Sequence, residues 1–174
     1  SLSSFIGRLD DIATVTRLLQ SARLVTITGA GGAGKTRLAQ QVAAEVLDRH
    51  TDGVWWVELA ELTDAASIPA AIAQAVGAKS VAGAGAVADL AERLADQQVL
   101  VVLDNCEHLV GDVAAVSDQL LRRAPGLVLL ATSREPLSVD GEVAWRIPPL
   151  AIPPDRQAGT PVAVAALSQF DAVR

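Results

Sequence analysis

The sequence has one cysteine, Cys106, no methionine or tyrosine, and as aromatic side chains only three tryptophans and two phenylalanines. A single cysteine cannot form an internal disulfide, so the composition gives no sign of an oxidising compartment. No apolar run approaches the roughly 18 residues that a membrane-spanning helix requires. The opening residues "SLSSFIGR" do not form a signal peptide. We therefore expect a cytoplasmic protein with no membrane contact.

Lysine is equally scarce, with only Lys35 and Lys79, and the net charge is −6. Sequence-independent binding of nucleic acid needs clustered lysine and arginine, so we expect no direct nucleic-acid binding by this chain. Hydrophobic residues nevertheless make up 51% of its 174 residues. With so few aromatic side chains, this composition predicts one domain with an aliphatic core.

Short apolar runs alternate with amphipathic segments along the chain. Strands are predicted over residues 23–28, 53–59, 99–104, 126–133 and 142–147, and helices over 9–19, 35–50, 67–77, 87–98 and 112–125. Ser67 is the expected N-cap of the third helix, and Gly77 its C-terminal stop. Apolar strands separated by helices indicate a parallel sheet covered on both faces, whose ligands bind at the carboxyl ends of the strands.

The first strand runs into a glycine-rich stretch that fits G-x-x-x-x-G-K-[ST]. Its residues are Gly29, Ala30, Gly31, Gly32, Ala33, Gly34, Lys35 and Thr36. Such a loop brings backbone N–H groups to phosphate oxygens at a helix N-terminus, where Lys35 reaches the β- and γ-phosphates and Thr36 ligates Mg²⁺. Arg37, the next residue, is also expected to contact the nucleotide. The alternative is a flexible glycine turn, which the flanking strand and helix disfavour.

A phosphate loop also needs a carboxylate that supports Mg²⁺ from a neighbouring strand. Asp104 ends the apolar run "VLVVLD" and is the expected ligand. The alternative is an aspartate that only caps a strand or a helix.

The residues after Asp104 differ from the common ATPase pattern. Many P-loop ATPases have an acidic residue directly after this aspartate, whereas this chain has Asn105, which cannot act as a base. Glu107 is the candidate base, or else it opens a helix and interacts with the helix dipole. We expect His108 to be structural and Cys106 to be a buried, unreactive side chain.

A third strand ends in "ATSRE" at residues 131–135. Arg134 would share an edge of the sheet with Lys35 and Asp104, where a guanidinium can detect a γ-phosphate. The alternative is a structural ion pair between Arg134 and Glu135 or Asp104.

These motifs together resemble a known family. The segments "FIGR" (5–8), the phosphate loop, "VLVVLDNCEHL" (99–109), "LLATSREPL" (129–137) and "WRIPPL" (145–150) occur in the order typical of STAND-class P-loop ATPases, the NB-ARC and NACHT relatives of AAA+ proteins. In particular, the chain resembles the ATPase module of large bacterial LuxR-type transcriptional regulators and adenylate cyclase fusions.

The resemblance implies an α/β three-layer fold around a parallel five-stranded sheet of order 5-1-4-3-2. It also implies that Ile6, Gly7 and Arg8 contact adenine. Residues 1–150 would form the nucleotide-binding domain, and residues 151–174 a proline-rich exit and the first helix of a lid. Flanking effector and sensor domains, and nucleotide-dependent self-association, are expected with it.

The sequence therefore favours a module that binds ATP or ADP with Mg²⁺ and acts as a slowly hydrolysing regulatory switch. In that function Lys35, Asp104, Glu107 and Arg134 would serve hydrolysis. Two alternatives remain: a non-catalytic module that holds ADP between domains, and a small-molecule kinase. Guanine is disfavoured because the chain has no "NKxD"-like motif.

Overall fold

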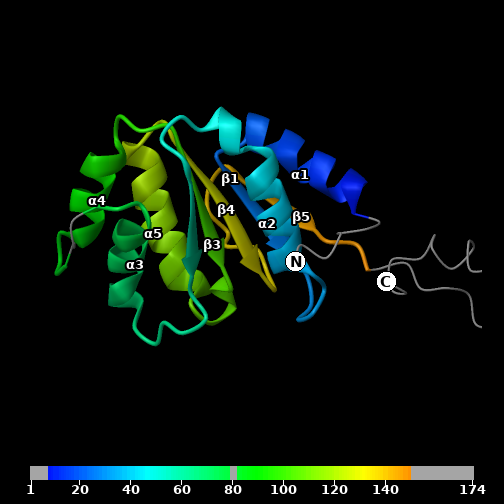
Figure 1. The fold of residues 1–174 in the computed structure, drawn as a ribbon. Helices are drawn as coiled ribbons and strands as arrows, with labels where there is room; N and C mark the ends of the chain where they lie inside the picture. Colours follow the sequence, from blue (N-terminus) through cyan, green and yellow to red (C-terminus); the bar gives the residue numbers. More distant parts are fainter. Residues whose placement is uncertain (1–7, 79–81, 150–174) are drawn as a thin grey trace, which may run out of the picture.

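The structure, a computed structural model, describes residues 8–78 and 82–149. Its centre is a sheet whose strands are β1 (Leu24–Thr28), β2 (Val54–Glu58), β3 (Val99–Asp104), β4 (Leu127–Ser133) and β5 (Glu142–Arg146). All neighbouring strands pair in parallel, in the order β2-β3-β4-β1-β5 (Figure 1). Counted from the opposite edge, this order is the expected 5-1-4-3-2, so the predicted sheet is confirmed.

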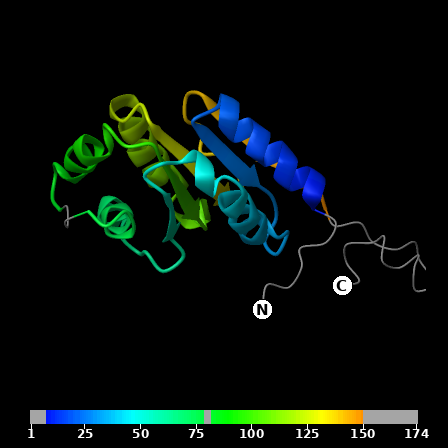
Figure 2. The same ribbon diagram turned by 45° about the horizontal axis from the view of Figure 1, so that its top comes forward.

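Helices cover both faces of this sheet and give the expected three layers. One face carries α1 (Leu9–Ser21) and α2 (Lys35–Glu45), and the other carries α3 (Ile68–Ala75), α4 (Ala86–Leu94) and α5 (Val110–Arg123). Figure 2 shows the sheet between these two groups of helices. The fold class predicted from the sequence is therefore confirmed.

The sheet divides the apolar core into two clusters. On β3, Val99, Val101 and Leu103 pack into the cluster with α3, α4 and α5, whereas Leu100 and Val102 pack into the cluster with α1 and α2. Alternate side chains of a strand point to opposite faces, so a strand covered on both sides must be apolar throughout. This requirement explains the uninterrupted apolar runs in the sequence.

The predicted cap of α3 is only half right. Ser67 makes no capping hydrogen bond, because the one-turn 3₁₀ helix Ala65–Ser67 precedes α3 and its N-terminus is capped by Asp64, which accepts from the Ala66 N–H at 3.0 Å. Gly77 does stop the helix: its φ is 69°, and the Ala78 N–H returns to the Ala73 carbonyl at 2.8 Å.

Two other helices end earlier than the hydrophobic pattern predicts. The helix predicted over 35–50 stops at Glu45 and continues as the 3₁₀ turn Leu47–Arg49. The tighter 3₁₀ winding takes Leu47 off the buried face, while Val46 remains buried. The helix predicted over 87–98 stops at Leu94.

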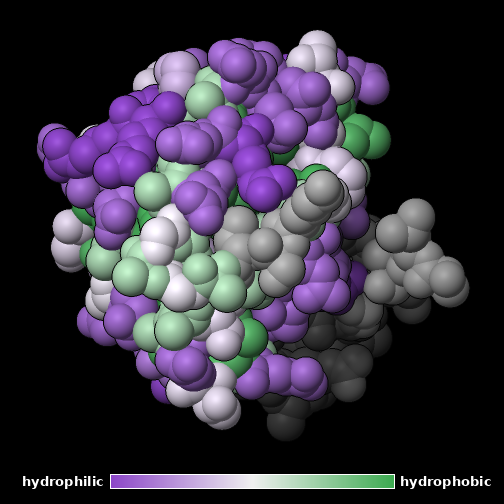
Figure 3. All heavy atoms as spheres, turned by 90° about the vertical axis from the view of Figure 1, so that its left-hand side faces the viewer, coloured by the Kyte–Doolittle hydropathy of each residue, from purple (hydrophilic) through white to green (hydrophobic). Residues whose placement is uncertain are grey.

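Most large hydrophobic side chains of the described residues lie inside the fold. The exposed ones within that part of the chain are Leu9 and Leu47. The surface seen from the left-hand side of Figure 1 is mostly hydrophilic, with an area of weakly hydrophobic residues (Figure 3). Within residues 8–78 and 82–149, no helix has both the length and the apolar character that crossing a membrane requires.

The strand register places polar residues side by side at the carboxyl edge of the sheet. Glu58 of β2 is aligned with Asp104 of β3, and Thr28 of β1 is aligned with Ser133 of β4. The loop after β1 and the turns after β3 and β4 consequently leave the sheet at neighbouring points. The predicted site residues are brought together by this register.

Gly126 directly precedes β4 and gives a test of how closely the chain packs at the amino ends of the strands. A Cβ at this position would lie 2.2 Å from the Gln97 carbonyl oxygen and 2.6 Å from Gln98 Nε2. Because the carbonyl belongs to the backbone, Gly126→Ala should destabilise the fold by about 1–3 kcal/mol in chemical denaturation.

Gly111→Ala is the matched control, since a Cβ at Gly111 in α5 meets nothing within 4 Å. This substitution should leave stability unchanged or raise it by up to about 1 kcal/mol. Equal effects at the two glycines would contradict the packing described for Gly126.

Candidate functional site

The glycine-rich loop lies between β1 and α2, and three of its glycines, Gly29, Gly32 and Gly34, have positive φ. Gly34 precedes α2 with φ 87° and ψ 19°, a left-handed conformation that favours glycine. At Gly29 a Cβ would lie 2.5 Å from Ile147 Cγ2, so the loop also approaches the chain after β5 too closely for a side chain. The loop therefore has glycine where its backbone conformation favours glycine.

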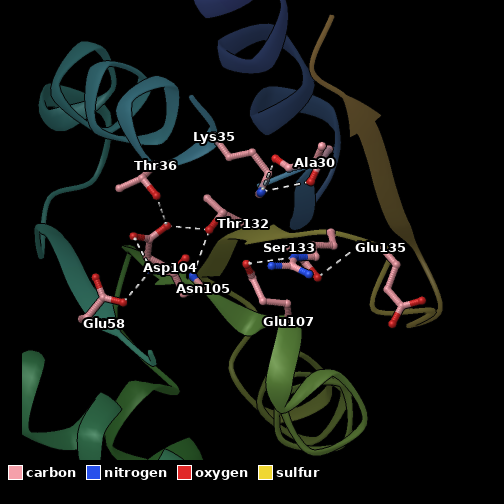
Figure 4. Close-up of polar contacts among 12 residues, drawn as sticks. Ala30, Lys35, Thr36, Glu58, Asp104, Asn105, Glu107, Thr132, Ser133 and Glu135 are labelled. Carbon is pink, nitrogen blue, oxygen red and sulfur yellow. Dashed lines mark hydrogen bonds and ion pairs between the residues drawn. The ribbon is translucent and has the colours of Figure 1, made fainter. Parts of the chain in front are cut away.

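Lys35 is the first residue of α2, and its side chain is buried against the loop. Its ammonium donates to the Gly29 carbonyl at 3.0 Å and to the Ala30 carbonyl at 3.1 Å (Figure 4). The first turn of a helix also presents N–H groups without intrahelical partners and the positive end of the helix dipole. This combination suits an anion held by the loop.

Asp104 is the last residue of β3, at the carboxyl ends of the strands, and it is fully buried. Its Oδ1 accepts one hydrogen bond from the Thr36 hydroxyl at 2.9 Å and another from the Thr132 hydroxyl at 2.5 Å. Burial raises the pKa of Asp104, these two hydrogen bonds oppose the rise, and the nearby charge of Glu58 adds to it. Figure 4 shows the four side chains converging from α2, β2, β3 and β4.

The pair formed by Thr36 and Asp104 fits a divalent cation. A hydroxyl and a carboxylate are oxygen donors of the kind that Mg²⁺ prefers, and Mg²⁺ is bound through few protein ligands. A cation here would also compensate the buried charge whose cost appears in the raised pKa of Asp104.

Arg134 follows β4 and reaches back over the glycine loop. Its Nη2 lies 3.7 Å from the position that a Cβ on Gly31 would occupy. Its Nε lies 3.8 Å from Glu107 Oε1. Arg134 thus forms an ion pair, as the structural alternative expects, but its partner is Glu107 and not Glu135 or Asp104.

Glu107 lies in the 3₁₀ turn Cys106–His108, between β3 and α5. Its Oε1 faces Arg134, and its Oε2 is buried without a hydrogen-bond partner among the described residues. Its assignment as the base stays a prediction.

Arg8 is buried and joins three segments of the chain. Its guanidinium donates to Asp11 at 2.7 Å, to the Pro148 carbonyl at 2.8 Å and to the Ala33 carbonyl at 3.4 Å. These contacts tie α1 and the chain after β5 to the glycine loop. The adenine contact of Arg8 stays a prediction.

The two remaining residues of the "CEH" turn are structural, as expected. Cys106 is buried, and burial raises the pKa of its thiol to about 12, which leaves the thiol protonated and unreactive. His108 Nε2 lies 2.9 Å from the Leu62 carbonyl and links this turn to the segment after β2.

For several predicted site residues the structure gives no contact that bears on the prediction. Ile6 and Gly7 lie outside the described residues, as do the proline-rich exit and the lid helix expected over 151–174. Arg37 lies in the first turn of α2, beside Thr36.

Sequence reasoning missed two side chains of this edge. Thr132 lies in the "ATSRE" segment that ends the third predicted strand, and it holds Asp104 through its hydroxyl. Glu58 was not singled out, although it ends β2 and accepts from the Asn105 amide at 2.8 Å. The available signal was its position at the end of a predicted strand, which the parallel-sheet rule marks as a place for ligand-binding residues.

The buried charge of Asp104 gives a stability prediction for the metal-free protein. Because folding raises the pKa of this carboxyl, its ionised form costs stability above the raised pKa, and this cost disappears as the pH falls. In EDTA at pH 7, Asp104→Asn should therefore raise the melting temperature, with a smaller gain at pH 5. Asp96→Asn, at an exposed position after α4, is the control. A lower melting temperature for Asp104→Asn at pH 7 would contradict this account.

The chain is similar in sequence to parts of longer bacterial proteins. It is 44% identical over 135 residues to a putative HTH-type transcriptional regulator of Mycobacterium tuberculosis, which covers 78% of this chain and 15% of the regulator. It is 42% identical over 154 residues to an uncharacterized protein of the same organism, covering 88% of this chain and 39% of that protein. The chain thus spans well under half the length of these relatives.

Solved structures with the same fold include a signal transduction ATPase with numerous domains and a chain of a DNA-bound complex. The STAND protein with a tetratricopeptide repeat sensor from Pyrococcus horikoshii matches 84% of this chain and 23% of its own, with TM-score 0.60 and 15% identity. A chain of Drosophila ORC bound to DNA matches 82% of this chain and 43% of its own, with TM-score 0.64 and 19% identity. At such identities these likenesses show the fold alone.

A family model described as an AAA domain matches residues 17–138. This span contains the glycine loop, Asp104 and Arg134, and the parallel sheet around them has the order expected for a P-loop ATPase. The chain therefore belongs to the AAA domain family and is a P-loop ATPase module.

Proposed function

We propose that this chain is the ATP-binding module of a larger signalling or transcription-regulating protein, in which the nucleotide acts as a slowly hydrolysed switch. The observation that carries the proposal is the hydrogen bond from Thr36 to the buried Asp104, directly beside the glycine loop. The similarity to a putative HTH-type transcriptional regulator supports the regulatory setting. The resemblance of the sequence motifs to STAND-class ATPases, which include modules of LuxR-type regulators and adenylate cyclase fusions, supports it as well.

In this proposal the phosphates occupy the loop of residues 29–34. Lys35 exchanges the carbonyls of Gly29 and Ala30 for oxygens of the β- and γ-phosphates. Backbone N–H groups at the start of α2 bind the same phosphates. Thr36 and Asp104 hold Mg²⁺, which when bound neutralises charge between the β- and γ-phosphates. The module takes ATP or ADP, with adenine recognised near Ile6, Gly7 and Arg8, and with Arg37 close to the phosphates.

Arg134 is proposed to report whether a γ-phosphate is present. In the structure this guanidinium is paired with Glu107 at the long distance of 3.8 Å, and its side chain is 68% exposed. A weak, solvent-exposed pair is readily exchanged for a phosphate, which offers closer bidentate contacts. The exchange would pull the turn after β4 toward the loop in the ATP state and release it in the ADP state.

The switch acts by biasing the arrangement of this module and the domains attached to it. Flanking effector and sensor domains are the expected partners, with nucleotide-dependent self-association as a further consequence. Hydrolysis is expected to be slow because Asn105 occupies the position where many related ATPases have their base. The charge of −6 favours regulation of attached domains over direct action on nucleic acid.

Lys35→Ala should abolish ATP binding, because it removes the charge that the loop directs at the phosphates. Isothermal titration calorimetry with Mg-ATP measures the affinity directly. Arg122→Ala is the control, since it removes one positive charge at the far end of α5 and should leave ATP affinity unchanged. An unchanged affinity of Lys35→Ala for Mg-ATP would contradict the assignment of the nucleotide site to this loop.

Arg134→Ala should weaken binding of ATP while leaving ADP affinity nearly constant. Loss of one charge-assisted contact to the γ-phosphate corresponds to roughly a tenfold weaker ATP affinity or more. The comparison needs calorimetry with both nucleotides, and Arg93→Ala in α4 serves as the control for a lost surface charge. Parallel losses for ATP and ADP would show that Arg134 does not distinguish the two.

Phosphate release from the chain with its flanking domains separates the switch from a module that holds ADP as a structural ligand. Slow but measurable release supports the switch, and tight ADP binding without any release supports the structural function. Transfer of the phosphate to a small molecule instead of water would indicate a kinase.

A further inference from the structure

Glu58 and Asn105 form a side-chain pair next to the proposed Mg²⁺ ligand. Glu58 ends β2, and the sheet register aligns it with Asp104 on β3. The Asn105 amide donates to Glu58 Oε1 at 2.8 Å and lies 3.4 Å from Asp104 Oδ2. Figure 4 shows Glu58 pointing toward Asp104 and Asn105 from the neighbouring strand.

The backbone explains why residue 105 is an asparagine. Asn105 has φ 62° and ψ 54°, the left-handed conformation that asparagine tolerates better than most residues with a side chain. Its N–H donates to the Thr132 hydroxyl at 3.0 Å, which fixes this conformation. A glutamate at the same position would be held in a less favourable backbone geometry. Residue 105 therefore contributes an amide that reaches across to β2.

The two candidate carboxylates differ in their surroundings. Glu58 is exposed, and its Oε1 accepts from two neutral groups, the Asn105 amide and the Ala60 N–H at 3.2 Å. Glu107 is half-buried and faces the positive charge of Arg134. A base must reach solvent water, and Glu58 is the more exposed of the two, whereas Glu107 is held in an ion pair with Arg134. These surroundings favour Glu58.

We propose that Glu58 is the base that activates water for ATP hydrolysis, and that Asn105 positions its carboxylate; this inference rests on the proposed function. The oxygen of a water molecule bonds to the γ-phosphorus as the bond from that phosphorus to the β,γ-bridging oxygen breaks. The electron pair of the broken bond stays on ADP. Glu58 takes one proton from the attacking water and later releases it to solvent, so inorganic phosphate and ADP are the products.

This assignment also agrees with the slow hydrolysis proposed above. The carboxylate of Glu58 is engaged by Asn105 and by its own loop, so it must be reoriented before it can bind the attacking water. Asn105 occupies the position where many related ATPases have their base, and its amide donates a hydrogen bond to Glu58 at the end of β2. Movement of the turn after β3 relative to the end of β2 would then change the rate.

The test compares Glu58→Gln, Glu107→Gln and Glu61→Gln in the same chain. Glu61 is an exposed glutamate in the segment after β2 and is the matched control. Single-turnover phosphate release should fall about 100-fold or more in Glu58→Gln, the usual contribution of a general base. Mg-ATP affinity by calorimetry and the melting temperature should stay close to the wild-type values. Glu61→Gln should behave as wild type. A loss of phosphate release in Glu107→Gln together with a wild-type rate in Glu58→Gln would assign the base to Glu107 instead.

Chemical rescue distinguishes a base from a structural residue. Glu58→Ala should regain part of its hydrolysis when formate is added, because formate can occupy the vacated space and accept the proton. A wild-type rate in Glu58→Gln, or a loss in Glu58→Ala that formate does not restore, would overturn the assignment to Glu58. Wild-type protein that binds Mg-ATP but releases no phosphate would overturn hydrolysis itself, and with it the function of Glu58.

Discussion

The site depends on one buried charge, the carboxylate of Asp104 at the end of β3. Burial raises its pKa, and the protein offsets this cost only in part, with hydroxyls from Thr36 and Thr132. These two residues come from α2 and β4, so the same contacts fix the glycine loop and the neighbouring strand around the carboxylate. A bound cation would complete the compensation. Without a cation, the ionised carboxylate that the proposed nucleotide site needs lowers the stability of the fold.

The parallel sheet could be predicted from the sequence because its strands are buried on both faces. Strand β3 was predicted with the bounds Val99–Asp104 that the structure has, since an uninterrupted apolar run ends there in a carboxylate. Helix ends were predicted less well. Helix α2 ends early and leaves Leu47 exposed in a 3₁₀ turn, and Asp64 instead of Ser67 makes the capping hydrogen bond before α3. Both differences arise from local turns, which hydrophobic periodicity does not describe.

The site could be predicted where it follows a local motif. Lys35 and Thr36 lie in the glycine pattern, and Asp104 ends an apolar strand, so each could be identified within its own segment. The partners of these residues could not be identified in this way. Glu58, Asn105 and Thr132 meet only because β2, β3 and β4 are neighbours in the correct register. Strand order therefore brings a second candidate carboxylate, Glu58, beside Asp104 and Asn105, whereas residue spacing alone pointed to Glu107.

The central claim is that the loop and Asp104 form one site for a nucleotide and its metal. Calorimetric titration of the wild-type chain with ATP, in Mg²⁺ and separately in EDTA, tests it most directly. The account predicts one ATP per chain, bound clearly more tightly in Mg²⁺ than in EDTA, because Thr36 and Asp104 contribute only through the metal. Absence of binding, or equal affinity under both conditions, would contradict it.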